Sequence, residues 1–326
     1  FRPTLLLSDQ GKIYFNITSR DRKKMDVCRA DINTGEVEVL IEERMNTYIE
    51  TRPLYLIKNE TEMIHWSERD GWAHFYRHDI NGNLLNRITS GPFHSDNIKY
   101  YDQKSNFLFF SAHGVNKEID PYYEHTYKIS LNGGVPKLLN KGDFNTMTYP
   151  SDNHKFFVNN FSRVNTTPKS NLINSDGSVI MNLETADLSA LFESGYKFPE
   201  TFKAKADDGI TDLYGVIYKP FDFDENKKYP LLEYVYPGPQ TESVNKSFSV
   251  RMDRLDRMAQ LGFIVITLGN RGGHPDRSKW YHNYGYGNLR DYGLADKKYV
   301  AQQLANRHDF IDINRVGIYG HSGGGF

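Results

Sequence analysis

The sequence predicts two consecutive folds, a partial β-propeller of about four blades over residues 1–195 and an α/β domain over residues 196–326. Three observations lead to this prediction. Turn signals recur regularly in the first part, strands alternate with helical stretches in the second, and a Gly-x-Ser-x-Gly motif follows the last predicted strand. The turn signals indicate repeated antiparallel sheets, and the alternation indicates a parallel sheet covered by helices. The motif indicates a reactive serine at the end of a strand.

The first part contains a degenerate repeat that is visible in its turns. Turn signals of the Asn-Gly or Asp-Gly type recur roughly every 45 to 50 residues, at residues 31–35, 79–83, 130–134 and 174–178. Strand-like runs precede them at 12–17, 62–67, 107–111 and 155–161, and short strands follow at 37–41 and 84–89. This pattern is typical of propeller blades, and the alternative is a β-sandwich with accidental regularity.

Beyond the fourth turn the pattern changes to that of an α/β domain. The predicted elements are a hairpin of 202–206 and 213–218, strands over 230–236, 263–268 and 315–319, and helices over 250–261 and 288–306. Met252, Leu255 and Leu261 lie near helical spacing in the first helix, as do Leu289 and Tyr292 in the second. Strands that alternate with helices imply a parallel sheet covered on both faces.

The composition is that of a globular protein without a strong charge. Hydrophobic residues make up 38% and aromatic residues 14% of the chain, which suits a strand-rich fold. The 40 Lys and Arg residues nearly balance the 41 Asp and Glu residues, so no overall field attracts nucleic acid or an anionic membrane. No apolar run approaches the ~18 residues of a membrane helix.

Neither cysteine nor histidine residues indicate a metal site. The one cysteine, Cys28, cannot form an internal disulfide, and we expect it to be a small buried hydrophobic residue. His113, His125, His154 and His274 lack the paired spacing of zinc ligands. We therefore expect neither a metal nor a cofactor.

The most informative motif is Gly320-His321-Ser322-Gly323-Gly324, which follows an apolar run. This pattern is typical of a nucleophile elbow, a sharp bend between a strand and a helix that holds a serine in a strained conformation. The glycines leave room for the bend. Ser322 is therefore the candidate nucleophile for acyl transfer in an α/β-hydrolase domain.

A serine nucleophile needs a histidine that accepts its proton and a carboxylate that orients this histidine. In α/β hydrolases both follow the serine in the chain, so we expect the triad Asp and His to lie outside residues 1–326. His321 is not expected to be the general base, because adjacent side chains on a sharp turn point apart, and we expect it to line the pocket instead. For residues 1–326 alone, truncated after the elbow, we expect negligible peptidase activity and an unpaired, aggregation-prone sheet edge.

A propeller followed by an α/β domain with a late nucleophilic serine resembles the prolyl oligopeptidase family of serine peptidases. Four segments narrow the resemblance to the dipeptidyl peptidase IV branch, namely Met25–Cys28, Trp66–Trp72, Lys228–Pro239 and Asn270–Gly273. The likeness spans essentially the whole chain. It implies the C-terminal part of a propeller and the N-terminal part of a catalytic domain.

The resemblance also implies an oxyanion hole with two donors. In this family the tyrosine of a V-Y-x-G-P segment donates its phenol to the oxyanion, together with the backbone N–H of the residue after the serine. These positions are Tyr236 and Gly323 here. A donor aimed at the developing charge is worth roughly 3 to 4 kcal/mol of the barrier. The alternative for Tyr236 is a core aromatic whose hydroxyl touches solvent.

Three features depart from the family pattern. The family usually carries a bulky aromatic residue where this chain has Gly323. The glutamate pair that captures a free amino terminus is not recognisable, and we expect Glu42-Glu43, which follows a blade strand, to be a solvated charge pair. Four blades are also fewer than the ring of this family, so part of the propeller is expected to be missing.

Three charged residues of the second part are not expected to take part in catalysis. Arg271, in the turn after a strand, is expected to pair with a carboxylate and to order the face of the sheet that carries the active site. Asp291 and Asp296, on the second predicted helix, are expected to be solvated.

The resemblance implies a serine exopeptidase that releases short peptides from free amino termini, with preference for Pro or Ala before the cut. The propeller would act as a size filter. One alternative is an oligopeptidase or acylaminoacyl-peptidase of the same superfamily, which needs no glutamate pair. Another is a non-catalytic propeller module that binds partners. The resemblance further implies peptide substrates, a homodimer, and a periplasmic or membrane-anchored extracytoplasmic location.

Overall fold

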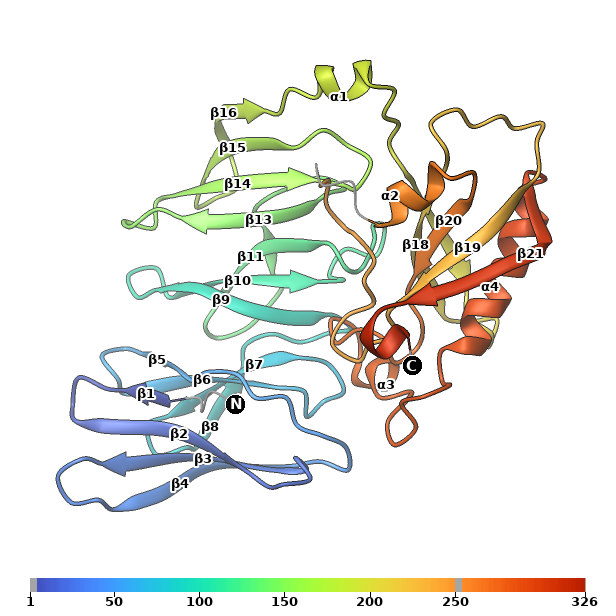
Figure 1. Ribbon diagram of the computed structural model, residues 1–326. Coiled ribbons are helices and arrows are strands. Elements are labelled where there is room, and N and C mark those ends of the chain that lie inside the picture. Colours follow the sequence, from blue (N-terminus) through green and yellow to red (C-terminus); the bar gives the residue numbers. More distant parts are fainter. Residues whose placement is uncertain (1–4, 250–253, 326) are drawn as a thin grey trace. The chain divides into compact units, whose positions relative to one another are not determined.

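The computed structural model describes residues 5–249 and 254–325, which form two compact units (Figure 1). The first unit comprises residues 1–116 and 124–141, and the second comprises residues 117–123 and 142–326. The segment 117–123, between two strands of the first unit, thus belongs to the second. The domain boundary expected between residues 195 and 196 remains a prediction.

Three antiparallel sheets of four consecutive strands make up the first unit. They contain β1 (Leu5–Leu7), β2 (Lys12–Thr18), β3 (Lys24–Asp31) and β4 (Val37–Arg44); β5 (Tyr55–Ile57), β6 (Glu62–Ser67), β7 (His74–Asp79) and β8 (Leu84–Arg87); and β9 (His94–Asp102), β10 (Phe107–His113), β11 (Glu124–Ser130) and β12 (Lys137–Leu138). In each sheet the predicted turn signal joins the third strand to the fourth. Successive four-stranded antiparallel sheets are typical of propeller blades.

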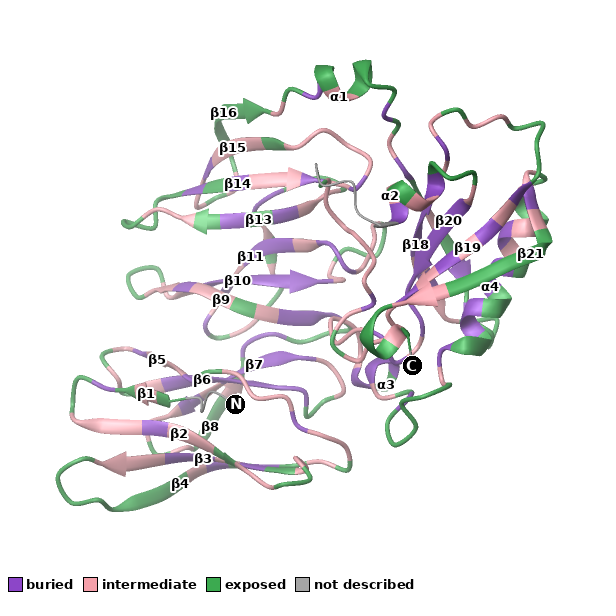
Figure 2. Ribbon diagram, in the orientation of Figure 1, coloured by how far each residue is buried: buried purple, intermediate pink, exposed green. Residues whose placement is uncertain are grey.

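Buried residues lie on strands of all three sheets of the first unit (Figure 2), and apolar cores join neighbouring sheets. Val27 and Met63 belong to a core shared by the first and second sheets. Phe75 and Phe110 belong to a core shared by the second and third, with their rings edge to face at 5.6 Å between centroids. Cys28 is free and fully buried, as predicted.

A fourth sheet of the same kind lies in the second unit. It consists of β13 (Asn145–Pro150), β14 (Phe156–Ser162), β15 (Lys169–Asn174) and β16 (Val179–Thr185), and the short helix α1 (Ser189–Glu193) follows it. The side-chain amide of Asn145 donates to the hydroxyl of Ser247 at 2.8 Å, and the backbone N–H of Phe248 donates to the hydroxyl of Ser162. These bonds attach the fourth sheet to the α/β part of its unit.

The α/β part is a five-stranded mixed sheet in the order β17-β18-β20-β19-β21. Its strands are β17 (Glu200–Lys205), β18 (Asp212–Tyr218), β19 (Tyr229–Val235), β20 (Ile264–Leu268) and β21 (Ile311–Gly320), and its helices are α2 (Arg254–Ala259), α3 (Lys279–His282) and α4 (Leu294–Arg307). The predicted hairpin is confirmed as β17 and β18. Strands β20, β19 and β21 are parallel. One apolar core includes residues of α4 and another includes residues of α2, and all five residues of β20 are buried.

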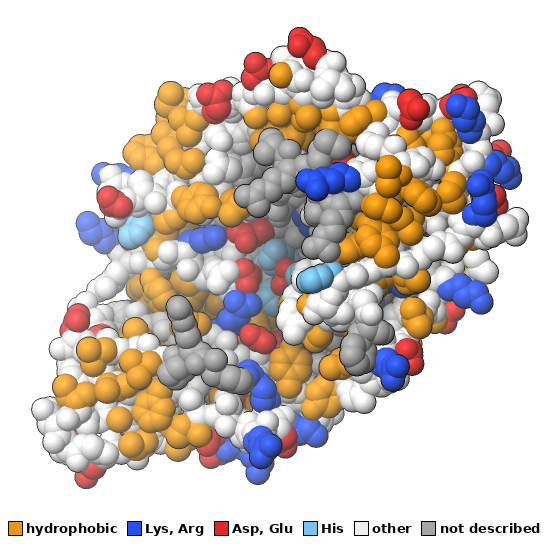
Figure 3. All heavy atoms as spheres, in the orientation of Figure 1, with side chains coloured by type: hydrophobic (Ala, Val, Ile, Leu, Met, Phe, Trp, Pro, Cys, Tyr) orange, Lys and Arg blue, Asp and Glu red, His pale blue; other side chains and the backbone are white. Residues whose placement is uncertain are grey.

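Within the described residues, β21 pairs only with β19 and forms the edge of the sheet. Its apolar residues Ile313, Val316 and Ile318 are exposed. Apolar side chains gather over this part of the second unit in Figure 3. None of the helices described here is long and apolar enough to cross a membrane.

The first helix predicted in the α/β domain ends two residues earlier than expected. Its predicted positions Val250 and Met252 lie outside the described residues, whereas Leu255 is buried on α2 as expected. The helix ends at Ala259, so placing Leu261 on a buried helical face was wrong, and this side chain is 71% exposed.

The second predicted helix begins six residues later than expected, at Leu294 as α4. Residues 289–293 form turns instead, Leu289 is exposed, and Tyr292 does not lie on a helix. Gly287 has φ of +83°, and Gly293 is the N-cap of α4 without a side chain to cap it. Glycine disfavours a continuous helix, which explains why the apolar spacing was misleading here.

Candidate active site

Ser322 lies on a sharp turn directly after β21. Its φ of +54° is in the left-handed region, which costs a non-glycine residue on the order of 1–3 kcal/mol. It begins the single turn η1 (Ser322–Gly324), in which the backbone N–H of Gly324 donates to the carbonyl of His321 at 2.9 Å. The serine thus has the strained strand–turn–helix geometry that the motif predicts.

Two glycines of the motif are needed by their surroundings, and one is not. A Cβ on Gly324 would stand 1.8 Å from the carbonyl oxygen of Val235, and a Cβ on Gly320 would stand 2.2 Å from the carbonyl oxygen of Gly324. At Gly323 a Cβ would meet nothing within 4 Å. The elbow therefore requires glycine at positions 320 and 324, but the packing around position 323 leaves room for a side chain.

Tyr236 follows β19 immediately and borders the elbow. In the parallel pairing of β19 with β21, Val235 is opposite Gly320, so the carboxyl ends of both strands meet at one edge of the sheet. The Cα of Tyr236 is 3.3 Å from the place of a Cβ on Gly324. Tyr236 is half-buried, and its phenol forms no hydrogen bond with a described residue. The structure thus brings Ser322, Gly323 and Tyr236 together.

A general base is not identified next to the serine. In the described part of the chain, the hydroxyl of Ser322 forms no hydrogen bond, and His321 is exposed. The expected role of His321 in lining a pocket remains a prediction.

The loop after Tyr236 is anchored through its carbonyl groups. The carbonyl oxygen of Pro237 accepts a hydrogen bond from the hydroxyl of Tyr292 at 2.7 Å and another from the side-chain amide of Asn270 at 3.2 Å. The carbonyl oxygen of Pro239 accepts one from Nε2 of His282 at 2.7 Å. Sequence reasoning missed these contacts, because they join residues that lie 33 or more positions apart in the chain.

Glu242, six residues after Tyr236, is a buried carboxylate between two phenols. It accepts hydrogen bonds from the hydroxyl of Tyr122 at 3.1 Å and from that of Tyr281. Burial, and then the charge of Glu242, raise the pKa of both phenols well above the usual value, so both remain donors. The guanidinium of Arg277 lies 4.2 Å from the centroid of the Tyr281 ring. A Cβ on Gly269 would stand 2.1 Å from a carboxylate oxygen of Glu242.

Arg271 pairs with a carboxylate, as predicted. Its Nη2 lies 2.7 Å from Oδ1 of Asp296, its backbone N–H donates to Oδ2 of the same residue, and Nη1 lies 3.2 Å from Asp208. The prediction that Asp296 is solvated was wrong, because it is fully buried in the first turn of α4 and also accepts from the backbone N–H of Asp207. Asp291 is exposed as expected, but it lies on a turn.

The prediction that Glu42 and Glu43 form a solvated pair was also wrong. Side chains alternate along β4, so Glu42 is exposed while Glu43 is buried. Glu43 contacts Nη2 of Arg69 at 2.6 Å and Nε2 of His65 at 3.1 Å. Burial disfavours the charge, but hydrogen bonds from His65 and Ser67 and the nearby guanidinium of Arg69 more than offset this and hold the pKa of Glu43 at about 2.

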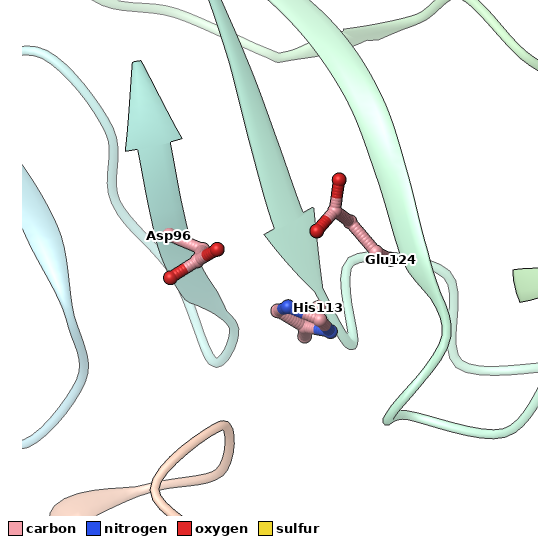
Figure 4. A group of neighbouring side chains, drawn as sticks. All are labelled: Asp96, His113 and Glu124. Atoms are coloured by element: carbon pink, nitrogen blue, oxygen red, sulfur yellow. The ribbon is translucent and has the colours of Figure 1, made fainter. Parts of the chain in front are cut away.

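A second group of potential ligands lies in the first unit (Figure 4). Asp96, His113 and Glu124 come from β9, β10 and β11, and their ligand atoms lie within 4.8 Å of one another. Asp96 pairs with Arg52 at 3.2 Å, and Glu124 pairs with Lys99 at 3.2 Å. Both carboxylates therefore have a cationic partner already, and we assign no metal to this group.

Two family models match the chain. The N-terminal region of dipeptidyl peptidase IV matches residues 5–168, and the prolyl oligopeptidase family matches residues 248–326. The second match includes Ser322.

Curated relatives carry related names. Human dipeptidyl peptidase 8 is 40% identical over 132 residues, which are 40% of this chain and 14% of that protein. A probable dipeptidyl-aminopeptidase B of Aspergillus terreus is 29% identical over 237 residues, which are 69% of this chain and 24% of that protein. The chain thus spans only a minor part of the relatives it matches.

Solved structures of similar fold cover nearly the whole chain. A Bacteroides ovatus protein, provisionally described as a dipeptidyl aminopeptidase IV, matches with a TM-score of 0.85 at 25% identity, over 99% of this chain and 48% of its own. Dipeptidyl peptidase 4 of Porphyromonas gingivalis matches with a TM-score of 0.83 at 23% identity, over 98% and 45%. Because the match to the dipeptidyl peptidase IV model alone covers half of the chain, the chain belongs to the dipeptidyl peptidase IV branch of the prolyl oligopeptidase family.

Proposed function

We propose that the full-length protein is a serine exopeptidase of dipeptidyl peptidase IV type, which releases dipeptides from free amino termini with Pro or Ala before the cut. The oxygen of Ser322 attacks the scissile carbonyl, and a general base accepts the proton of the serine. The base then protonates the leaving amine as the C–N bond breaks, and water hydrolyses the acyl-enzyme. The phenol of Tyr236 and the backbone N–H of Gly323 stabilise the oxyanion.

One observation carries this proposal: a serine with φ of +54° follows β21, beside the end of β19 that leads to Tyr236. A strained serine at the carboxyl end of a parallel strand supports a nucleophile, because this geometry exposes the hydroxyl at the sheet edge. The names of the relatives support the release of dipeptides. The preference for Pro or Ala comes from the family resemblance.

The remaining features of the proposal concern the architecture. The four antiparallel sheets are four blades of a propeller, which filters substrates by size, and the catalytic domain begins near residue 196. The family resemblance supports a homodimer and an extracytoplasmic location. For a polypeptide limited to residues 1–326, negligible hydrolysis is expected, because Ser322 has no hydrogen-bonded base in the described part of this stretch.

Hydrolysis of matched chromogenic substrates tests the proposed activity. The full-length protein should release p-nitroaniline from Gly-Pro-p-nitroanilide much faster than from the same compound with a blocked amino terminus. The variant Ser322→Ala should lose both activities while its circular dichroism spectrum stays unchanged. Equal rates on free and blocked substrates would favour an oligopeptidase or acylaminoacyl-peptidase, and a folded protein without any hydrolysis would favour a binding module.

A further inference from the structure

The loop that starts at Tyr236 has two prolines, which reduces the number of its backbone donors. We call residues 236–242 the Tyr236 loop. Pro237 and Pro239 have no backbone N–H, so at these two positions only the carbonyl oxygens can form backbone hydrogen bonds. Both carbonyl oxygens accept bonds from side chains that lie far away in the sequence. The position of the loop is thus set from outside.

Two of these side-chain donors bind the carbonyl oxygens of the residues directly before and after Gly238. The hydroxyl of Tyr292 is 2.7 Å from the carbonyl oxygen of Pro237, the residue directly after Tyr236. Nε2 of His282 is 2.7 Å from the carbonyl oxygen of Pro239. A Cβ on Gly238 would stand 2.4 Å from the carbonyl oxygen of Gly273, so the backbone between the two anchors is also packed closely.

The far end of the loop is held as well. Glu242 is buried and accepts hydrogen bonds from the phenols of Tyr122 and Tyr281. Tyr281 directly precedes His282 on α3, so one short helix holds the loop at two points. A buried carboxylate with two phenol donors costs much to move, because any displacement leaves a charged group without its partners.

We propose that Tyr292 and His282 are positioning residues for Tyr236, which they place relative to Ser322 through the carbonyl groups of Pro237 and Pro239. This inference rests on the proposed function. A donor to the oxyanion must already point to the place where the charge develops, and a displacement of about 1 Å can cost about 100-fold in rate. Neither positioning residue needs to contact the substrate.

The protonation states of both groups suit this role. Burial lowers the pKa of His282 to about 4, so the ring is neutral near pH 7 and its Nε2 carries the hydrogen that the carbonyl accepts. Burial raises the pKa of Tyr292 to about 12, so its phenol remains a donor. Both anchors therefore persist over the range in which a serine peptidase is assayed.

Removing one hydroxyl tests the anchor at Pro237. In the full-length protein, Tyr292→Phe should lower kcat about 3- to 10-fold, the size of one lost hydrogen bond, with KM changed by less than about two-fold. The matched control is Tyr299→Phe, a tyrosine on the outer side of α4, which should leave both constants unchanged. An unchanged kcat in folded Tyr292→Phe would overturn the role of this residue.

A conservative replacement tests the anchor at Pro239. His282→Gln keeps an N–H donor near the same place and should retain most of kcat, whereas His282→Met should lose about 3- to 10-fold. Equal activity of the two folded variants would overturn the role of His282.

A double-mutant cycle separates positioning from general stability. In a Tyr236→Phe background the oxyanion donor is absent, so adding Tyr292→Phe should lower kcat no further. An additional loss equal to that in the wild-type background would show that Tyr292 acts independently of Tyr236 and would overturn the proposal. If Tyr236→Phe itself leaves kcat unchanged, the oxyanion role in the proposed function fails instead.

Discussion

The backbone of Gly324 packs against the carbonyl oxygen of Val235 so closely that a Cβ would stand 1.8 Å from this oxygen. This approach joins the turn after β21 to the last residue of β19. Because Tyr236 is the next residue, the elbow and the candidate oxyanion donor form one compact piece of backbone. The distance between Ser322 and Tyr236 therefore depends on the absence of a side chain at Gly324.

Substitution of this glycine should disrupt the elbow. In the full-length protein, Gly324→Ala should slow the reaction of Ser322 with a fluorophosphonate at least about 100-fold, because the backbone must shift by about 1 Å or more. Gly323→Ala is the matched control, because it keeps the backbone N–H at this position and its Cβ would meet nothing within 4 Å, so Ser322 should react at nearly the normal rate. Similar rates for both variants would contradict the close packing described here.

Loss of the Tyr236 phenol should affect catalysis rather than binding. Tyr236→Phe keeps the ring but removes the candidate donor, so kcat should fall about 10²- to 10³-fold with little change in KM. Steady-state kinetics on a dipeptide substrate checks this prediction. A variant with normal kcat would show that Tyr236 is only a half-buried aromatic residue.

The buried ion pair of Asp296 and Arg271 should be important for stability. Asp296→Ala leaves a largely buried guanidinium without its main partner and should lower the free energy of unfolding by about 3–5 kcal/mol. Asp291→Ala removes an exposed carboxylate and should change the free energy of unfolding by less than about 0.5 kcal/mol. Urea unfolding of both variants provides the comparison, and equal stabilities would refute the structural role of Asp296.

The second sheet of the first unit should lose stability in mild acid. Burial lowers the pKa of His74 and His78 to about 4, whereas an unfolded histidine titrates near 6.5. The unfolded chain then binds more protons, so stability is full above pH 6.5 and declines as the pH falls to about 4, by on the order of 3 kcal/mol for each residue. Glu43, with a pKa of about 2, stays ionised throughout this range.

Hydrogen exchange of β6 and β7 as a function of pH, after correction for the intrinsic exchange rate, checks this prediction. Protection should decrease between pH 6.5 and 4, and His78→Gln should flatten the decrease. His154→Gln, at an exposed histidine, should leave the pH profile unchanged. Protection independent of pH in the wild-type protein would contradict the account.

Local sequence patterns predict those features that depend on neighbouring residues. The turn signals at 31–35 and 79–83 each connect two strands of one sheet, and the motif around Ser322 forms the predicted strained turn. Tyr236 was expected at a strand end and follows β19 directly. In each case the decisive interactions lie within a few residues or between paired strands.

Features that depend on distant contacts could not be predicted in this way. Asp296 and Glu43 have ordinary charged side chains in amphipathic segments, and only the approach of Arg271, and of His65 and Arg69, makes their burial favourable. Tyr292 has the spacing of a helical core residue, yet the helix begins only after Gly293. Its phenol instead donates a hydrogen bond to the carbonyl oxygen of Pro237.

Site-specific labelling tests the central claim most directly. The full-length protein is treated with a fluorophosphonate probe, and the modified peptide is identified by mass spectrometry. We predict that a single label appears on Ser322, that a dipeptide substrate with a free amino terminus slows the labelling, and that Ser322→Ala abolishes it. A folded protein that releases dipeptides while its label lies on another residue, or whose Ser322 never reacts, would contradict the assignment of this serine as the nucleophile.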